Sequence, residues 1–263
     1  MSMRKEGEVV CVTGGSGYIG SWLVSLLLRR GYTVHATVKH LNDEKETKHL
    51  QALEGAESRL SLFQMDLLRY DSILAAVHGV AGVFHLASPV IVDQVQDLEL
   101  WYSVSKTLAE KAAWEFAKEQ SLDVVVLNPG TAMGPILPPN LNASMLMLLL
   151  LLQGCTETYE DVFMGSVHVK DVALAHILLY ENPSPTGRHL CVEAISHYGD
   201  FAAKVAELYP KYKVPRLPRD TQPGLLRAKN ASKKLMELGL NFIPMEEIIK
   251  DAVESLKNKG FIS

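Results

Sequence analysis

The stretch that decides the fold of this chain is VVCVTGGSGYIG, residues 9–20. Its first four residues are a continuous apolar run, which is typical of a strand buried on both faces of a parallel sheet. Gly14, Gly17 and Gly20 follow, and the apolar residues Trp22–Leu28 predict a helix. Glycine permits a tight turn and lets a diphosphate approach bare backbone at a helix N-terminus. The strand–turn–helix order therefore predicts a dinucleotide-binding unit rather than a purely structural turn.

The sequence that follows alternates between strand and helix patterns. Strands are predicted at 33–38, 60–63, 82–86 and 123–127, and helices at about 43–53, 72–77 and 103–119. This alternation predicts an α/β protein with a Rossmann-type, doubly wound parallel sheet. Prolines become frequent after residue 129. We therefore expect residues 1–130 to form the dinucleotide-binding domain, with 165–181 returning to it, and residues 131–263 to form a smaller C-terminal substrate lobe.

The end of the second strand indicates which dinucleotide binds. An NAD-binding strand usually ends in an acidic residue about 20 residues past the glycine turn, where it holds the ribose hydroxyls. This strand instead leads into Lys39, and Lys45 follows, so two cations can reach a 2′-phosphate. We therefore expect NADP rather than NAD, although the acidic residues within 43–46 also fit a solvated loop. Asp66, just past the third strand, either accepts the adenine amino group or is a simple turn residue.

A tyrosine and a lysine stand one helical turn apart at Tyr102 and Lys106. Carbonyl reduction needs a proton donor at the oxygen while hydride reaches the carbon. A tyrosine, with an ordinary pKa of about 10, becomes a better acid and base beside a fixed cation. Tyr209 and Lys213 share the spacing, but a proline interrupts that helix. We expect Tyr102 and Lys106 to be catalytic because their helix leads to a strand and to the loop Asn128–Thr131.

Together these motifs resemble the extended short-chain dehydrogenase/reductases, in particular the plant group of cinnamoyl-CoA reductase-like and dihydroflavonol reductase-like proteins. The shared segments are VTGGSGYIGSWLV (12–24), the Lys39-x5-Lys45 spacing, VFHLASP (83–89), WYSVSKTLAEKAAWEFA (101–117), NPGTAMGP (128–135) and VHVKDVALAHI (167–177). The resemblance implies NADPH-dependent reduction of an aromatic or phenylpropanoid-type carbonyl, with Lys106 also binding the cofactor. The cofactor site that follows comprises Gly14, Gly17, Tyr18, Ile19, Gly20, Lys39, Lys45, Asp66, Leu67, Ala87, Ser88, Lys106, Pro129, Gly130 and Thr131.

Two departures from the family pattern surround the tyrosine. Cinnamoyl-CoA reductases carry Asn-Trp-Tyr-Cys-Tyr-Gly-Lys where this chain has Leu100–Lys106, so a CoA-thioester substrate is unsupported. Only 12 residues separate Pro89 from Tyr102, whereas a helix, a strand and their loops need roughly 25. In the family this stretch includes the strand that ends in the catalytic serine or threonine. The sequence therefore predicts an excision near Leu98–Trp101.

The excision has predicted consequences for structure and activity. Ser88, Ser103 and Ser105 are the nearest hydroxyls, but none follows a strand in the required place. The helix from residue 103 is expected to act as a right-handed crossover that joins the strands at 82–86 and 123–127 and closes the gap. We expect a reductase impaired by loss of the catalytic serine or threonine. The alternative is a catalytically inactive NADP-binding isoform, and a nucleotide-sugar epimerase is disfavoured by the family-specific segments.

Composition limits the other possibilities. A net charge of -4 and a pI near 6.1 give no electrostatic reason to expect nucleic acid or an anionic membrane as partner. The apolar run at 145–152 is too short to span a bilayer. The three cysteines are scattered and form neither a disulfide framework nor a zinc motif, so no metal is expected. The pattern favours a cytoplasmic protein with a small-molecule substrate, and it does not predict an oligomeric state.

Overall fold

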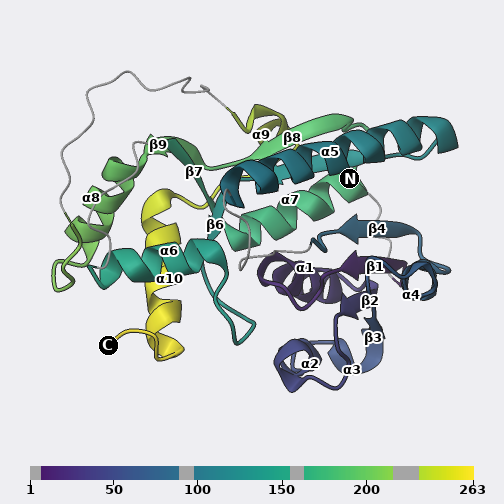
Figure 1. Cartoon of the computed structure of the whole chain (residues 1–263), viewed down its shortest axis with the longest axis horizontal. Helices are drawn as coiled ribbons and strands as arrows, with labels where there is room; N and C mark the ends of the chain where they lie inside the picture. Colours follow the sequence, from purple (N-terminus) through teal and green to yellow (C-terminus); the bar gives the residue numbers. More distant parts are fainter. Residues whose placement is uncertain (1–6, 89–97, 155–162, 216–230) are drawn as a thin grey trace.

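Four strands of the predicted parallel sheet form in the N-terminal part of the chain (Figure 1). They are β1 (Val9–Thr13), β2 (Thr33–Val38), β3 (Leu60–Gln64) and β4 (Gly82–His85), paired in parallel in the order β3-β2-β1-β4. Helices α1 (Tyr18–Arg29), α2 (Glu44–Gln51), α3 (Ala56–Arg59) and α4 (Tyr70–Val77) connect them. The computed structural model describes residues 7–88, 98–154, 163–215 and 231–263, with the backbone alone for 98–103. The predicted Rossmann-type α/β fold is confirmed.

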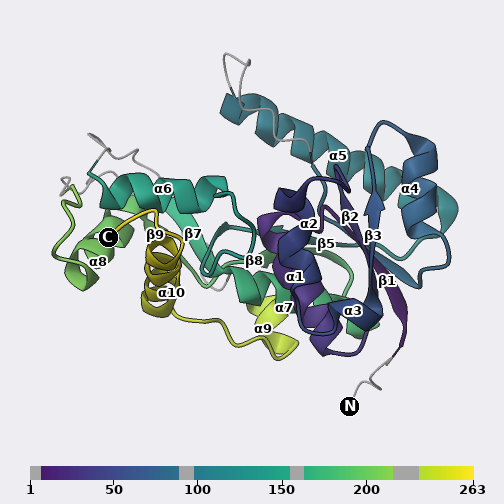
Figure 2. The same cartoon turned by 90° about the horizontal axis from the view of Figure 1, so that it is seen from below.

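The remaining strands form two smaller sheets. In the first, β5 (Val125–Pro129) pairs in parallel with β8 (Gly187–Cys191). In the second, β7 (Phe163–His168) lies between β6 (Thr131–Met133) and β9 (Ala194–His197). The helices of this part are α6 (Ala143–Leu152), α7 (Val169–Glu181), α8 (Tyr198–Leu208), α9 (Lys233–Glu237) and α10 (Met245–Asn258). Figure 2 shows α6, α8 and α10 grouped at the end of the molecule opposite β1–β3.

Helix α7 joins the two parts of the molecule. It packs against α1, and both helices bury apolar residues in a common core. At the end of α7, Glu181 accepts a hydrogen bond from Arg30 Nη1 at 2.6 Å and another from the Tyr32 hydroxyl at 3.1 Å. Tyr180 donates to Glu8 and its ring lies 5.2 Å from that of Phe84 in β4. These contacts hold the four-stranded sheet against the C-terminal part of the chain.

The sheet is interrupted where the sequence predicts a missing strand. Among the described residues β4 pairs only with β1, and β5 pairs only with β8. The prediction that the following helix closes this gap is therefore wrong. That helix, α5 (Leu98–Gln120), connects β4 to β5, but β4 is held by β1 and Tyr180, and β5 is held by β8. Among the described residues, α5 therefore connects β4 and β5 without bringing them into one sheet.

The broken sheet leaves side chains exposed that a complete sheet would bury. Val83 in β4 is 48% exposed, and the β5 residues 125–128 are only half-buried although the sequence predicts a buried strand. Helix α5 lies at the outside of the molecule in both views (Figures 1 and 2), and of its described side chains only Ala117 is buried.

Within the described residues, no helix combines the length and the apolar character needed to cross a bilayer.

A buried carboxylate in α7 predicts a pH-dependent stability. Asp171 is 4% exposed and accepts a hydrogen bond from the backbone N–H of Ile243 at 2.8 Å. Burial raises the pKa of Asp171 to about 6, while that hydrogen bond and the positive charge of Lys170 lower it to a smaller extent. Because the folded-state pKa lies above the unfolded value, the charged form costs stability above pH 6, and this cost disappears as the pH falls towards 4. Asp171→Asn is therefore expected to stabilise the fold by about 2 kcal/mol at pH 7 and by little at pH 4.

Urea denaturation of both proteins at pH 4, 5, 6 and 7 measures this difference. Asp123→Asn, at an exposed position, is the control and should give a small, pH-independent change. A difference between Asp171→Asn and the parent that stays constant from pH 4 to 7 would contradict the prediction.

Candidate active site

The glycine turn between β1 and α1 leaves no room for side chains on its backbone. Gly14 has φ +68°, and a Cβ on it would lie 3.0 Å from the Ala87 Cα. A Cβ on Gly20 would lie 2.2 Å from the Gly14 carbonyl oxygen, and a Cβ on Gly15 would lie 2.8 Å from Ala36 Cβ. The Gly17 N–H donates to the Gly14 carbonyl at 3.0 Å and tightens the turn. The backbone itself is therefore the surface that the turn offers to a ligand.

The N-terminus of α1 is suited to an anion. Its N-cap, Gly17, has no capping side chain, and the first turn contains no acidic residue. The first amides of a helix lack partners within the helix, and the helix dipole adds positive potential there. The Tyr18 side chain is buried and donates to the Gly134 carbonyl at 3.0 Å, so only its backbone can reach a phosphate. The backbone at Tyr18, Ile19 and Gly20 thus fits the diphosphate of a dinucleotide.

Two threonines that sequence reasoning missed fix the strand ends around this turn. The Thr13 hydroxyl accepts hydrogen bonds from the backbone N–H groups of Leu86 and Ala87 at 3.0 and 3.1 Å. Thr37 accepts through its hydroxyl from Gly14 N–H at 3.0 Å and through its carbonyl from Gly15 N–H at 2.9 Å. Both threonines end or nearly end a strand beside the glycine turn, which is the signal that could have revealed them. They bring the ends of β1, β2 and β4 together.

The expected 2′-phosphate position carries an acidic residue as well as lysines. Lys39 and Lys45 are both exposed at the end of β2 and the start of α2. Glu46, the residue after Lys45, accepts through Oε2 from the backbone N–H groups of Lys39 at 2.6 Å and His40 at 3.2 Å. This contact, which the sequence did not predict, places a negative charge on the amides beside the lysines. The two lysines therefore act against the carboxylate of Glu46 in addition to those of Asp43, which caps α2, and Glu44.

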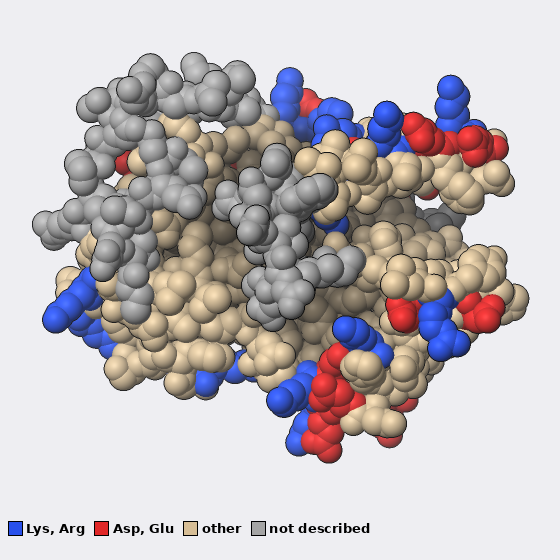
Figure 3. All heavy atoms as spheres, viewed as in Figure 1, with Lys and Arg blue, Asp and Glu red and all other residues tan. Residues whose placement is uncertain are grey.

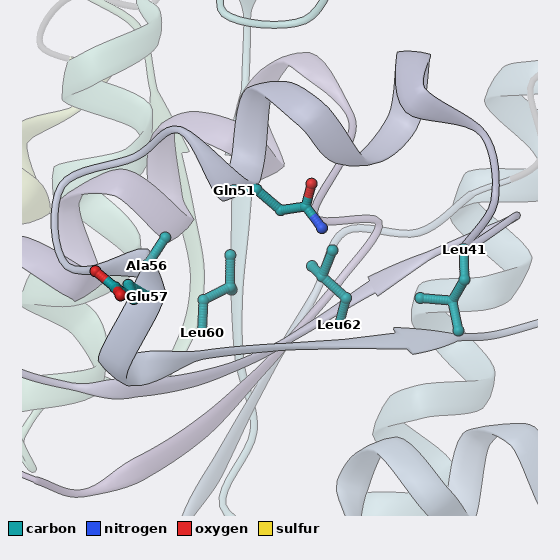
Figure 4. Close-up of a pocket in the computed structure, with 6 residues that line it drawn as sticks. All are labelled: Leu41, Gln51, Ala56, Glu57, Leu60 and Leu62. Carbon is teal, nitrogen blue, oxygen red and sulfur yellow. The ribbon is translucent and has the colours of Figure 1, made fainter.

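Asp66 and Leu67 lie in an exposed turn after β3. Asp66 Oδ1 accepts from the Leu68 N–H at 2.9 Å, so this carboxylate organises the turn, as the simple-turn interpretation holds. A nearby open pocket of about 280 Å³ lies between α2, α3 and β3 (Figure 4). The side chains of Leu41, Gln51, Ala56, Glu57, Leu60 and Leu62 line it, so it does not include the predicted site residues.

The predicted catalytic pair lies on α5. The backbone of Tyr102 is in its first turns, while the Tyr102 side chain lies outside the described residues. Lys106 is exposed, and its charge acts on His85 at the end of β4. Two effects lower the pKa of His85, although the residue as a whole is exposed. Desolvation by neighbouring atoms is the larger, and the positive charge of Lys106 is the smaller. His85 Nδ1 is 2.9 Å from the hydroxyl of Thr13, the residue that precedes the glycine turn.

The segment Pro129–Thr131 joins β5 to β6. Gly130 N–H donates to the Cys191 carbonyl at 3.1 Å, and a Cβ on Gly130 would lie 2.2 Å from the Gly165 carbonyl oxygen. Thr131 is paired with Ser166 in the neighbouring sheet. The loop that follows contacts α1, because Trp22 Nε1 donates to the Pro135 carbonyl at 2.7 Å. Ala87 and Ser88, also predicted at the cofactor, are half-buried just beyond β4.

Comparison with known proteins places these features in a family. Two family models match the chain, GDP-mannose 4,6 dehydratase over residues 11–98 and the NAD dependent epimerase/dehydratase family over residues 99–192. Cinnamoyl-CoA reductase CAD2 of Medicago truncatula is 40% identical over 324 aligned positions that include 99% of each chain. Dihydroflavonol 4-reductase of Callistephus chinensis is 34% identical over 96% of this chain and 87% of that protein. The crystal structure of vestitone reductase from alfalfa (Medicago sativa) is 31% identical, with a TM-score of 0.82 over 97% of this chain and 99% of that one.

The same comparisons show that this chain is shorter than its relatives. The alignment to CAD2 spans 324 positions, whereas the chain has 263 residues, so CAD2 carries several dozen residues that this chain lacks. The two family models meet between residues 98 and 99, within the junction that the sequence predicts. This position also lies between β4 and β5, the strands with free edges. The chain belongs to the cinnamoyl-CoA reductase-like and dihydroflavonol reductase-like group of the extended short-chain dehydrogenase/reductases, in a form shorter than its relatives.

Proposed function

We propose that this chain binds NADPH at the glycine turn and reduces an aromatic, phenylpropanoid-type carbonyl, with turnover far below that of its full-length relatives. The observation that carries the proposal is the crowded backbone of Gly14–Gly20 at an uncapped helix N-terminus. Membership of a family of reductases supports the reaction class. The interruption between β4 and β5 supports the reduced turnover.

Three regions of this chain would each hold a different part of the cofactor. The backbone at Gly14, Gly17 and the first turn of α1 would hold the diphosphate. Lys39 and Lys45 would face the 2′-phosphate, and Asp66 would face the adenine. The loop Pro129–Thr131, together with Ala87 and Ser88, would line the nicotinamide end, where Lys106 would hold the ribose. NADPH, when bound, supplies the hydride.

The chemical step then depends on α5. Tyr102 would donate a proton to the substrate's carbonyl oxygen as negative charge develops there. Lys106, one helical turn further on, would stabilise the resulting tyrosinate by its positive charge. In the family a serine or threonine at a strand end holds the same oxygen. Among the described residues no strand lies between β4 and β5 to present that hydroxyl.

A second candidate function follows from the same interruption. If the lost strand displaces Tyr102 from the nicotinamide, the chain binds NADPH without reducing a carbonyl, since an error of about 1 Å can cost on the order of 100-fold in rate. This candidate and the slow reductase share the cofactor site and differ only in turnover.

Calorimetry with NADPH and NADH, followed by assays of NADPH oxidation with cinnamaldehyde, tests the proposal. We expect NADPH to bind more tightly than NADH, and turnover at least about 100-fold below that of M. truncatula CAD2 measured alongside. Absence of heat with millimolar NADPH would contradict the proposed cofactor site. Turnover equal to that of CAD2 would contradict the impairment, and binding without any turnover would favour the second candidate.

The carboxylate of Glu46 gives a separate prediction about cofactor preference. Glu46→Gln retains an acceptor for the amides of Lys39 and His40 but removes the negative charge beside the lysines. We expect the NADPH Kd to fall by about threefold to tenfold and the NADH Kd to stay unchanged, because only NADPH carries the 2′-phosphate. Glu44→Gln removes an equal charge two residues away, in the same first turn of α2, without these hydrogen bonds and is the matched control. Titrations of both variants with NADPH and with NADH measure the effect. An equal fall in the NADH Kd of Glu46→Gln would contradict the 2′-phosphate as its cause.

A further inference from the structure

The imidazole of His49 connects helix α2 to the glycine turn. His49 lies in the last turn of α2 and is half-buried, and its Nε2 is 2.9 Å from the hydroxyl oxygen of Ser21 in α1. Ser21 is fully buried, and its hydroxyl oxygen lies 2.7 Å from the carbonyl oxygen of Gly17 and 3.2 Å from that of Gly15. One serine side chain therefore contacts two carbonyls of the glycine turn and a histidine of the neighbouring helix.

The surroundings of Ser21 determine which nitrogen of the ring carries the proton. A hydroxyl has one proton to donate, and Ser21 gives it to Gly17, the nearer of the two carbonyls. If Ser21 donated to His49 instead, its lone pairs would face both carbonyl oxygens. The contact therefore requires His49 to donate through Nε2–H. Desolvation, followed by the positive charge of Lys259, lowers the pKa of His49, so the ring is neutral at pH 7.5.

The outer face of α2 is turned to solvent. Glu44, Lys45 and Lys48 are exposed, and Figure 3 shows acidic and basic side chains side by side over α2 and α3. Leu50 is fully buried and packs in the apolar core on the inner side of the helix. His49 adds a directed polar contact to that apolar packing, because its Nε2 meets the Ser21 hydroxyl of α1.

We propose that His49 is a positioning residue of the dinucleotide site: its Nε2–H holds the Ser21 hydroxyl, which holds the carbonyls of the glycine turn and so fixes the amides that face the diphosphate. Thr37 holds the same turn from the β2 side by accepting hydrogen bonds from two of its backbone amides. Hydrogen bonds to an anion weaken when the donors shift, so loosening either contact lowers the affinity for the diphosphate. This inference rests on the proposed cofactor site and adds a residue that acts through Ser21 without touching the cofactor.

NMR of the protein without cofactor tests the contact itself. At pH 7.5 the imidazole nitrogen shifts of His49, assigned by comparison with His49→Gln, should report the Nε2–H tautomer. Ser21→Ala removes the acceptor and should speed exchange of that proton with water. An Nδ1–H tautomer, or an exchange rate that Ser21→Ala does not change, would overturn the proposal.

Calorimetry with NADPH and with NADH tests the consequence for binding. His49→Leu should raise both Kd values by about tenfold, the effect of losing one buried hydrogen bond, because both dinucleotides contain the diphosphate. His49→Gln places an amide N–H close to the position of Nε2 and should keep both Kd values within about threefold of the parent. His49→Asn, whose shorter side chain does not reach Ser21, should behave like His49→Leu. His78→Leu, at an exposed position, is the control and should leave both Kd values unchanged.

A double-mutant cycle shows whether His49 acts through Ser21. Ser21→Ala should raise the NADPH Kd by about tenfold, and adding His49→Leu should raise it little further, because both changes remove the same contact. A loss of about 100-fold in the double variant, an unchanged Kd in His49→Leu, or no rescue by His49→Gln would overturn the role of His49. Absence of NADPH binding by the parent chain would instead contradict the proposed cofactor site, and with it the consequence for binding.

Discussion

A variant with the several dozen residues that M. truncatula CAD2 carries and this chain lacks, inserted between Leu98 and Glu99, is expected to raise kcat for NADPH-dependent cinnamaldehyde reduction by about 100-fold or more. Over the same change, the NADPH Kd is expected to shift by less than about threefold, because the diphosphate site depends on local backbone at the glycine turn. The inserted strand supplies two things that the chain lacks: a hydroxyl for the substrate's carbonyl oxygen, and a neighbour for β4 and β5 that fixes the start of α5. Tyr102 and Lys106 would then be held where the reaction occurs.

Two controls separate these contributions. In the first, the inserted segment carries alanine at every serine and threonine, which restores the sheet without the hydroxyl. This variant should recover stability but should remain about 10-fold to 1000-fold below the full insertion in kcat, as expected for loss of one transition-state donor. In the second, Tyr102→Phe within the full insertion should remove most of the gain. An unchanged kcat after an insertion that folds and binds NADPH would contradict the impairment proposed for the parent chain.

The part of the fold that sequence predicted well is the part that local pattern determines. Val9–Val12, the glycine turn and the apolar helix after it form β1, the turn and α1, although α1 begins at Tyr18 rather than at Trp22. Glycine there is required by backbone geometry within a few residues, so the signal is contained in the sequence itself. The family resemblance followed from the same short segments.

Predictions that depended on distant pairing were less successful. The missing strand was predicted from the shortness of the connection, but the prediction that α5 closes the sheet was wrong, because among the described residues β4 pairs only with β1 and β5 only with β8. The length of a connection does not specify which strand edges it brings together. β5, which pairs only with β8 among the described residues, is only half-buried despite its apolar sequence. The contact of Glu46 with the amides of Lys39 and His40 depends on how α2 folds back on β2. Residue spacing alone does not specify such side-chain-to-backbone contacts.

Gly14→Ala should weaken NADPH binding by about 100-fold, the second large effect expected of this structure. Alanine at φ +68° is strained, and its Cβ would also lie 3.0 Å from Ala87 Cα, tighter than ordinary contact. The turn must shift to relieve this contact, and the amides at the start of α1 move with it. Hydrogen bonds from those amides to the diphosphate weaken when the donor–acceptor distance changes, so NADPH affinity should fall more than the stability of the fold does.

Gly79→Ala is a matched control for this prediction. Gly79 has φ +75°, close to that of Gly14, but a Cβ there meets nothing within 4 Å. Both variants should therefore lose about 1–2 kcal/mol of stability from backbone strain alone, measured by urea denaturation. Only Gly14→Ala should lose NADPH affinity in calorimetry, because only its methyl group crowds the β4 end that borders the turn. If the two variants bound NADPH equally well, the glycine turn would be a structural feature and the diphosphate would have to bind elsewhere.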